Sequence, residues 1–121
     1  MTESPITMSI DMKKRRIRIH KYTLHALAEP RYIQLLINTE KKLIAIKGLD
    51  VMQSGDQTYT IDAKNIATDE SCDIYSDLLV RQLYWLIENI KHNATYRLTG
   101  QLVKAHRLVV FDLMTMERVE S

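Results

Sequence analysis

The chain has little cysteine, glycine or proline: one, three and two residues of 121. The single cysteine, Cys72, excludes a disulfide within the chain and leaves a cysteine-based zinc site without ligands. Gly48, Gly55 and Gly100 stand apart from one another, so the chain has no glycine-rich loop of the kind that binds phosphate. No apolar run approaches the roughly 20 residues that span a bilayer. We therefore expect a cytoplasmic protein with no membrane partner.

Neither sign of charge predominates. Lys and Arg number 17, Asp and Glu number 15, and the formal net charge is +2. This balance argues against a protein that coats DNA, and equally against an acidic mimic of nucleic acid, unless the charges are segregated by face. The length fits a single domain over residues 1–121. Residues 1–5 have no periodicity, and we expect them to be disordered.

Apolar and polar residues alternate early in the chain, with the two-residue period of a half-buried strand. Over residues 6–12 this alternation predicts an edge strand, or an extension that becomes ordered on a partner. Over residues 17–20 it predicts a second short strand, and residues 72–75 form another short extended run.

Two longer stretches share one outline. Residues 32–49 (YIQLLINTEKKLIAIKGL) read as two apolar strands around a polar turn, and residues 96–113 (YRLTGQLVKAHRLVVFDL) repeat that outline sixty-four positions later. A short helical pattern over residues 22–29 precedes the first stretch and is ended by Pro30, because the residue before a proline is pushed out of the helical region.

A longer helical pattern precedes the second stretch. Ser76 is a good N-cap, and Asp77 suits the positive end of a helix dipole. The pattern predicts a helix from residue 77 to about residue 91. Its apolar stripe consists of Leu79, Leu83, Leu86, Ile87 and Ile90.

These elements form two units of the type strand–helix–strand–strand, over about residues 17–49 and 72–114. A helix that packs on a hairpin covers its apolar face, and hairpins pair antiparallel. The predicted fold class is therefore α+β, with two units related by pseudo-twofold symmetry, a largely antiparallel sheet and one long helix. Residues 108–113 are apolar on both faces, which indicates either a central strand or a self-association surface hidden in a homodimer.

The strongest charge feature is residues 13–21 (KKRRIRIHK), in which seven of nine residues are basic when His20 is counted. One interpretation is an arm that contacts the phosphates of nucleic acid. The other is a solvated edge strand, in which basic residues prevent unwanted strand pairing. The candidate partner-binding residues of this run are Lys13, Lys14, Arg15, Arg16 and Arg18.

Tyr84 and Trp85 are the second group of candidate partner-binding residues. Both lie on the predicted long helix, beside its apolar stripe. Tyr and Trp are enriched where proteins contact one another. The alternative is a wide helix stripe that is buried against the sheet. Met114 and Met116, with Met8 and Met12 near the N-terminus, are either an adaptable apolar surface or fillers at a frayed edge.

Nothing in the sequence indicates catalysis. The four histidines are scattered, without the spacing of a helical metal motif. Cys72 lies in a short apolar strand, which favours an inert core thiol over a nucleophile. Asp69, Glu70 and Asp73 form one acidic cluster, which does not make a general acid–base pair. We therefore expect no enzymatic activity, no cofactor and no metal.

The run AEPRYIQLLINTEKKLIAIKG, together with YRLTGQLVKAHRLVVFDL, resembles a group of small proteins from phages and mobile elements of Gram-positive bacteria. The shared features are a helix that ends near a proline, a YIQLLIN strand, an IAI strand and a closing FDL, over roughly residues 17–114. The resemblance implies a host bacterial cytoplasm and carries over no catalytic residue. Small proteins of this kind include anti-CRISPR inhibitors of type II RNA-guided nucleases.

Two hypotheses follow. The first is a non-enzymatic protein–protein interaction module from a phage or mobile element, in its sharpest form an anti-CRISPR that binds a host CRISPR nuclease. The alternative is a small DNA-binding transcriptional regulator that uses the basic arm over residues 13–21.

Overall fold

The computed structural model describes residues 6–53, 58–61 and 71–119, so the predicted disorder of residues 1–5 lies outside the described part. Its helical segments are α1 (Lys21–Ala26), α3 (Asp77–Leu86) and the 3₁₀ turns η1 (Lys104–His106) and η2 (Leu113–Thr115). Its strands are β1 (Thr7–Asp11), β2 (Arg16–Ile19), β3 (Tyr32–Asn38), β4 (Leu43–Leu49), β5 (Thr58–Thr60), β6 (Cys72–Tyr75), β7 (Thr95–Val103), β8 (Leu108–Asp112) and β9 (Glu117–Val119).

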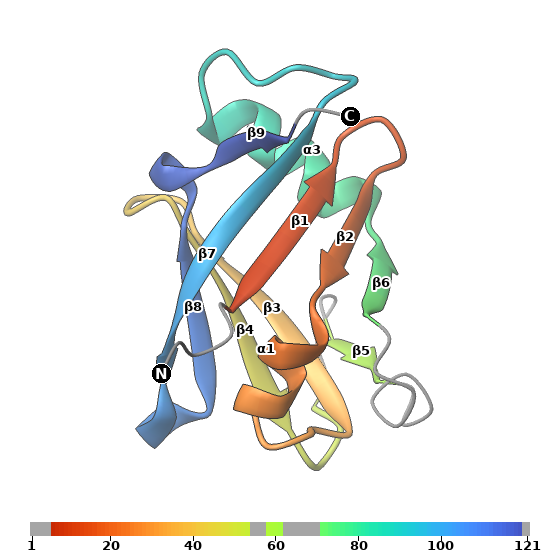
Figure 1. Ribbon diagram of the computed structural model, residues 1–121, viewed down its shortest axis with the longest axis vertical. Helices are drawn as coiled ribbons and strands as arrows, with labels where there is room; N and C mark the ends of the chain where they lie inside the picture. Colours follow the sequence, from red (N-terminus) through yellow and green to blue (C-terminus); the bar gives the residue numbers. More distant parts are fainter. Residues whose placement is uncertain (1–5, 54–57, 62–70, 120–121) are drawn as a thin grey trace.

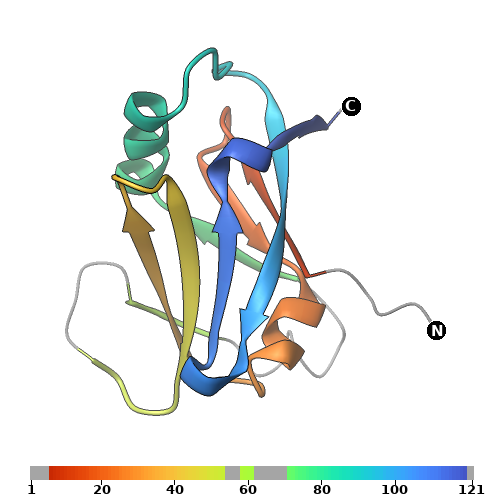
Figure 2. The same cartoon turned by 90° about the vertical axis from the view of Figure 1, so that its left-hand side faces the viewer.

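The strands form one antiparallel sheet that curls almost into a barrel (Figures 1 and 2). Among the described residues their order is β5-β3-β4-β8-β7-β1-β2-β6, and β9 pairs with β7 beside this path. Figure 1 shows α3 across the upper end of the barrel and α1 at its lower end. Of the residues that the structure describes, 47% are in strands, so the helices are a minor part of the fold.

The predicted α+β class with one long helix is therefore wrong. That prediction assumed that a helix must cover the apolar face of each hairpin. Instead, the sheet coils on itself, so the inward faces of opposite strands cover one another. The largest fully buried side chains are Phe111, Met8, Ile10, Ile17, Ile19, Leu24, Leu27, Ile33, Leu35, Ile44, Ile46 and Leu79.

The predicted long helix begins where expected but ends early. The Ser76 hydroxyl accepts a hydrogen bond from the Leu79 N–H (3.2 Å), which caps the first turn. At Ile87 the backbone is already extended, although its N–H still bonds to the Leu83 carbonyl. Asn89 then takes a left-handed conformation, with φ at 63°. The chain from Ile87 onward is consequently free to cross the end of the barrel.

The basic strand β2 and its neighbour β1 are not at an edge. β1 lies between β2 and β7, and β2 lies between β1 and β6. The predictions of an edge strand for both segments are therefore wrong. Their polar and apolar residues still alternate, because the outward side chains of these internal strands face solvent while the inward ones fill the core.

The doubly apolar strand β8 is internal, between β4 and β7. Val109 and Phe111 point into the barrel and are buried, whereas Leu108 and Val110 on the outer face are half-buried. A central position thus accounts for the inner face. The homodimer that the outer face suggested stays a prediction.

Candidate protein-binding surface

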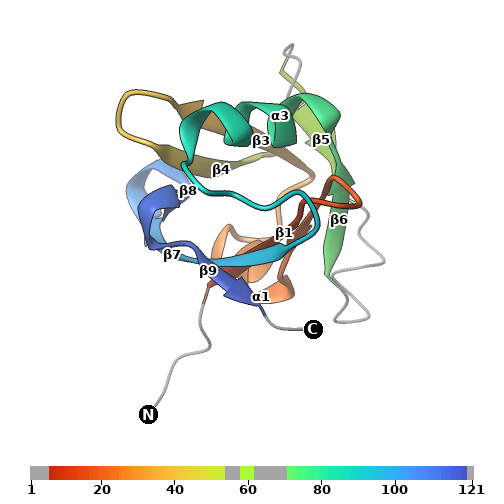
Figure 3. The ribbon, with the colours of Figure 1, turned by 90° about the horizontal axis from the view of Figure 1, so that it is seen from above.

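The surface around the end of α3 combines exposed aromatic and apolar side chains. Seen from above in Figure 3, α3 lies along one side of the barrel end, and the chain that follows it crosses this end to reach β7. Residues 87–90 of that chain line two adjoining hollows. We call the following residues the α3-end surface: Tyr84, Trp85, Ile87, Ile90, Met114 and Met116.

The first hollow lies against the last turn of α3 and has a volume of about 450 Å³. Trp85 forms one of its walls and is 90% exposed. Tyr84 is half-buried and packs against the ring of His92, with 4.5 Å between ring centroids. Ile87 and Ile90 add apolar lining, and Glu88 and Asn89 add polar lining. An indole thus stands in solvent beside a depression of mixed polar and apolar lining.

The second hollow, of about 380 Å³, is lined by the same segment together with residues of β7 and of the turn η2. Met114 is 67% exposed and Met116 is half-buried, and both line it. Its wall includes Tyr96, whose hydroxyl accepts a hydrogen bond from the Lys91 N–H (2.9 Å) and so fixes the crossing segment. Flexible thioethers suit contact with partners of varied shape.

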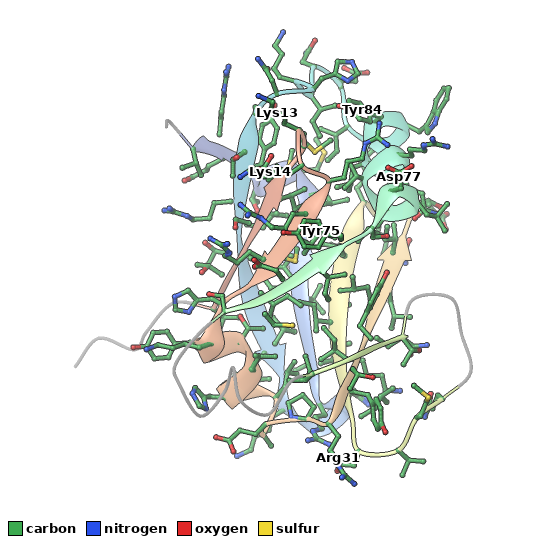
Figure 4. All side chains as sticks on the ribbon, turned by 90° about the vertical axis from the view of Figure 1, so that its right-hand side faces the viewer. Lys13, Lys14, Arg31, Tyr75, Asp77 and Tyr84 are labelled. Carbon is green, nitrogen blue, oxygen red and sulfur yellow. The ribbon has the colours of Figure 1, made fainter. Side chains whose placement is uncertain are left out.

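The basic turn between β1 and β2 lies beside α3. Figure 4 shows Lys13 and Lys14 on the same side of the molecule as Asp77 and Tyr84. Arg15 forms an ion pair with Asp77, and its carbonyl accepts a hydrogen bond from the Ser76 N–H (3.1 Å). The structure therefore brings the tip of the basic run and the helix with the aromatic pair together.

The arginines of β2 are engaged by aspartates. The Arg16 guanidinium lies 3.5 Å from a carboxylate oxygen of Asp11. Arg18 donates from Nε and Nη2 to both carboxylate oxygens of Asp73, at 2.8 and 3.0 Å. This hydrogen bond raises the pKa of Arg18 and holds the pKa of Asp73 below its ordinary value. Much of the positive charge of the run is thus matched within the molecule.

Sequence reasoning placed the site's residues only in part. It named Tyr84 and Trp85 but did not decide whether they were exposed. It placed Ile87 and Ile90 in the buried stripe of a helix, because nothing in their spacing signals that α3 ends at Leu86. The four methionines divide: Met114 and Met116 line the second hollow, while Met8 and Met12 are buried in the core.

Within residues 6–53, 58–61 and 71–119, no group of three or more His, Cys, Asp or Glu residues is placed to hold a metal. Cys72 is buried in the core, as predicted. His25 of α1 lies 3.0 Å from Glu29, three residues beyond the end of that helix, and His20 stacks on Tyr22. The histidines of these pairs therefore have local partners instead of converging on one cleft.

Comparison of the chain with protein-family models, with curated proteins and with solved structures gave no match. The resemblance to phage and mobile-element proteins, and the host cytoplasm that it implies, therefore stay predictions. In the part of the chain that the structure describes, neither the length nor the apolar character of any helix is sufficient to cross a membrane.

Proposed function

We propose that this protein is a non-enzymatic protein–protein interaction module and that it contacts its partner through the α3-end surface. The observation that carries the proposal is the 90% exposure of Trp85 beside two adjoining hollows, which Ile87, Ile90 and the methionines line together with polar residues. An indole in water contributes nothing to the stability of the fold, whereas Trp is among the residues that dominate binding energy at protein interfaces.

The chemistry of the surface defines the partner. The hollows receive apolar side chains, and Trp85 inserts into an apolar pocket of the partner. Lys13, Lys14 and Arg81 are exposed around α3, so an acidic rim on the partner complements them. Arg81 already shares Asp77 with Arg15. The two lysines, for which no ion pair is found among the described residues, are therefore the stronger electrostatic contacts.

Affinity capture from a bacterial lysate tests this proposal, with mass spectrometry of the bound proteins. Loss of a central aromatic contact costs about 2 kcal/mol or more, which corresponds to roughly 30-fold in Kd. Trp85→Ala is therefore expected to lose a protein that the unmodified chain retains. Leu102→Ala is the matched control, because Leu102 is also exposed and lies six residues further along β7 than Tyr96, roughly 20 Å away. Identical sets of bound proteins for both variants would contradict the proposal.

The sharper form of the proposal, an anti-CRISPR inhibitor, rests on the sequence resemblance. Its test uses a purified type II nuclease loaded with guide RNA, in a binding assay and a DNA-cleavage assay. Inhibition by the unmodified chain and its loss in Trp85→Ala would support it. Unimpaired cleavage with no binding would remove the nuclease as the partner and leave the broader proposal to the capture experiment.

The alternative, a DNA-binding regulator with a basic arm, is the weaker proposal, because Arg15, Arg16 and Arg18 each have an aspartate partner. Replacement of Lys13 and Lys14 by alanine separates the two functions. If the arm binds DNA, affinity falls steeply as salt rises, and the double variant shows a shallower dependence on salt. If the two lysines serve a protein partner, DNA binding does not change with the substitutions.

A further inference from the structure

A third hollow, apart from the two beside α3, lies on the outer wall of the barrel, over β1, β2, β7 and β9. Its volume is about 390 Å³, and its lining is rich in hydrogen-bond donors. The residues that line it are Thr7, Met8, Ser9, Arg18, His20, Thr95, Arg97 and Val119. No Asp or Glu is among them. This wall groove shares no residue with the α3-end surface.

Strand register places two arginines on either side of a serine. Ser9 on β1 pairs with Arg18 on β2 and with Arg97 on β7. Neighbouring strands are about 4.8 Å apart, so the two arginine backbones are about 10 Å apart across Ser9. Both side chains line the same groove. An anion above Ser9 is therefore approached by a guanidinium from each side.

The two arginines differ in their partners. Arg18 is fixed by Asp73, which takes its Nε and Nη2 and leaves Nη1 for another acceptor. Arg97 is exposed and has no ion pair among the described residues, although Glu117 is opposite it on β9. The groove thus holds one positioned guanidinium and one unpaired guanidinium.

His20 adds a further donor. Its Nδ1 accepts a hydrogen bond from the Tyr22 N–H (3.3 Å), and its ring stacks on the Tyr22 ring at 5.0 Å. A neutral imidazole that accepts at Nδ1 carries its proton on Nε2. Burial lowers the pKa of His20, with Lys21 as a smaller cause. The ring is therefore a neutral donor at neutral pH.

From these contacts we infer that the wall groove binds a phosphate group. The two guanidiniums and the Ser9 hydroxyl lie level with one another on three strands. Thr7 and His20 line the groove towards one side of that level, and Thr95, which is opposite Asp11, lines it towards the other side. A tetrahedral phosphate presents oxygens to donors on several sides at once, and guanidinium forks match two of those oxygens. A carboxylate has two oxygens in one plane and leaves part of this donor set without an acceptor.

The test measures binding of inorganic phosphate to the purified chain by titration calorimetry or by NMR shifts. Arg97→Ala is expected to weaken binding by about tenfold or more, since it removes a charged donor. Arg118→Ala is the matched control: Arg118 is also exposed, and on β9 it pairs with the buried Tyr96, one position from Arg97. Unchanged binding in Arg118→Ala, together with loss in Arg97→Ala, supports the inference.

Two further ligands, an oligonucleotide and citrate, test the source of the phosphate and the selectivity of the groove. A short single-stranded oligothymidylate that binds more tightly than inorganic phosphate, with the same dependence on Arg97, identifies a nucleic-acid strand as the source. Equal affinities identify a small phosphorylated compound. The inference is overturned if citrate binds as well as phosphate, if both arginine variants lose binding equally, or if neither phosphate nor the oligonucleotide binds. Trp85→Ala leaves phosphate binding unchanged, so this inference and the proposed function fail separately.

Discussion

The two helices follow the two strands of one pair, β2 and β6, but the chain leaves their C-terminal ends differently. Each begins at a residue whose side chain accepts a backbone hydrogen bond, His20 for α1 and Ser76 for α3. After α1 the chain turns sharply through Ala28 and Glu29, both with positive φ. After α3 the backbone is extended at Ile87 and turns at residues 88–89, where Asn89 has positive φ, before the chain crosses the end of the barrel.

A single arginine from another part of the chain accounts for the closed end of α1. Arg107 donates from Nε to the Leu27 carbonyl (2.7 Å) and from Nη2 to the Ala28 carbonyl (3.1 Å), and it pairs with Asp50 (2.8 Å). These bonds satisfy carbonyls that a helix end leaves without partners. The end of α3 has no arginine of this kind among the described residues, and there Trp85 is exposed. The end of the barrel at α1 is thus held by Arg107, whereas at the other end α3 and the crossing segment cover the barrel and leave Trp85 exposed.

The largest expected effect on stability comes from the buried leucine that each helix contributes to the core. Leu24 of α1 and Leu83 of α3 are both 0% exposed. Leu24→Ala and Leu83→Ala are each expected to lower the free energy of unfolding by about 2–5 kcal/mol, because each leaves a cavity in the core. Chemical denaturation measures both. A loss below 1 kcal/mol for either variant, taken as roughly the lower limit for such a cavity, would show that its helix is not part of the core.

The next effect tests the closed end of α1. Arg107→Asn removes the guanidinium but keeps a residue that tolerates the left-handed backbone at this position, where φ is 50°. We expect a loss of about 1–3 kcal/mol, since two carbonyl partners and an ion pair disappear. Lys104→Ala in the same turn is the control and is expected to stay within about 0.5 kcal/mol. Equal stability of both variants in denaturant would contradict the role given to Arg107.

A smaller effect concerns the strand pair that leads into the helices. Arg18 lowers the pKa of Asp73 in the folded chain, so the unfolded chain takes up a proton at this site first as pH falls. The stability from the pair is present above the ordinary Asp pKa of 3.8 and is lost as pH falls through the folded-state value. The difference in unfolding free energy between the wild type and Asp73→Asn should therefore shrink from about pH 5 to about pH 2. A constant difference over this range would contradict the pairing.

The smallest effect on stability is expected for the exposed Trp85 at the end of α3. Trp85→Ala is expected to change the free energy of unfolding by no more than about 0.5 kcal/mol, because the side chain is 90% exposed. The same denaturation series measures it beside Leu83→Ala, on the opposite face of α3. A loss comparable with that of Leu83→Ala would mean that Trp85 is buried in solution.

The local elements of this fold were readable from the sequence. The apolar strand expected at the start of residues 32–49 and the extended run expected over residues 72–75 were confirmed as β3 and β6, and Ser76 correctly marked the start of α3. Closure of the sheet was not readable, because it depends on pairings between distant strands, such as β4 with β8 and β2 with β6. The short strand β9 was also missed, because its three residues alternate too briefly to give a signal.

The candidate site was likewise predicted from the sequence only in part. An aromatic pair on a predicted helix marked Tyr84 and Trp85, but their exposure depends on where α3 ends. That end is set by the left-handed Asn89 and by the bond from the Lys91 N–H to the Tyr96 hydroxyl, neither of which has a periodic signature. The wall groove was missed because Arg97 and Arg18 are 79 positions apart in the chain and meet only through the register of β1.

Fluorescence of Trp85, the single tryptophan of the chain, tests the central claim most directly. In the isolated protein the indole is expected to emit and to be quenched by iodide as a fully hydrated side chain, at every protein concentration. Addition of the captured partner should shift the emission to the blue and protect the indole from iodide. A blue-shifted, protected indole in the isolated protein would contradict the account, because the α3-end surface would then already be covered.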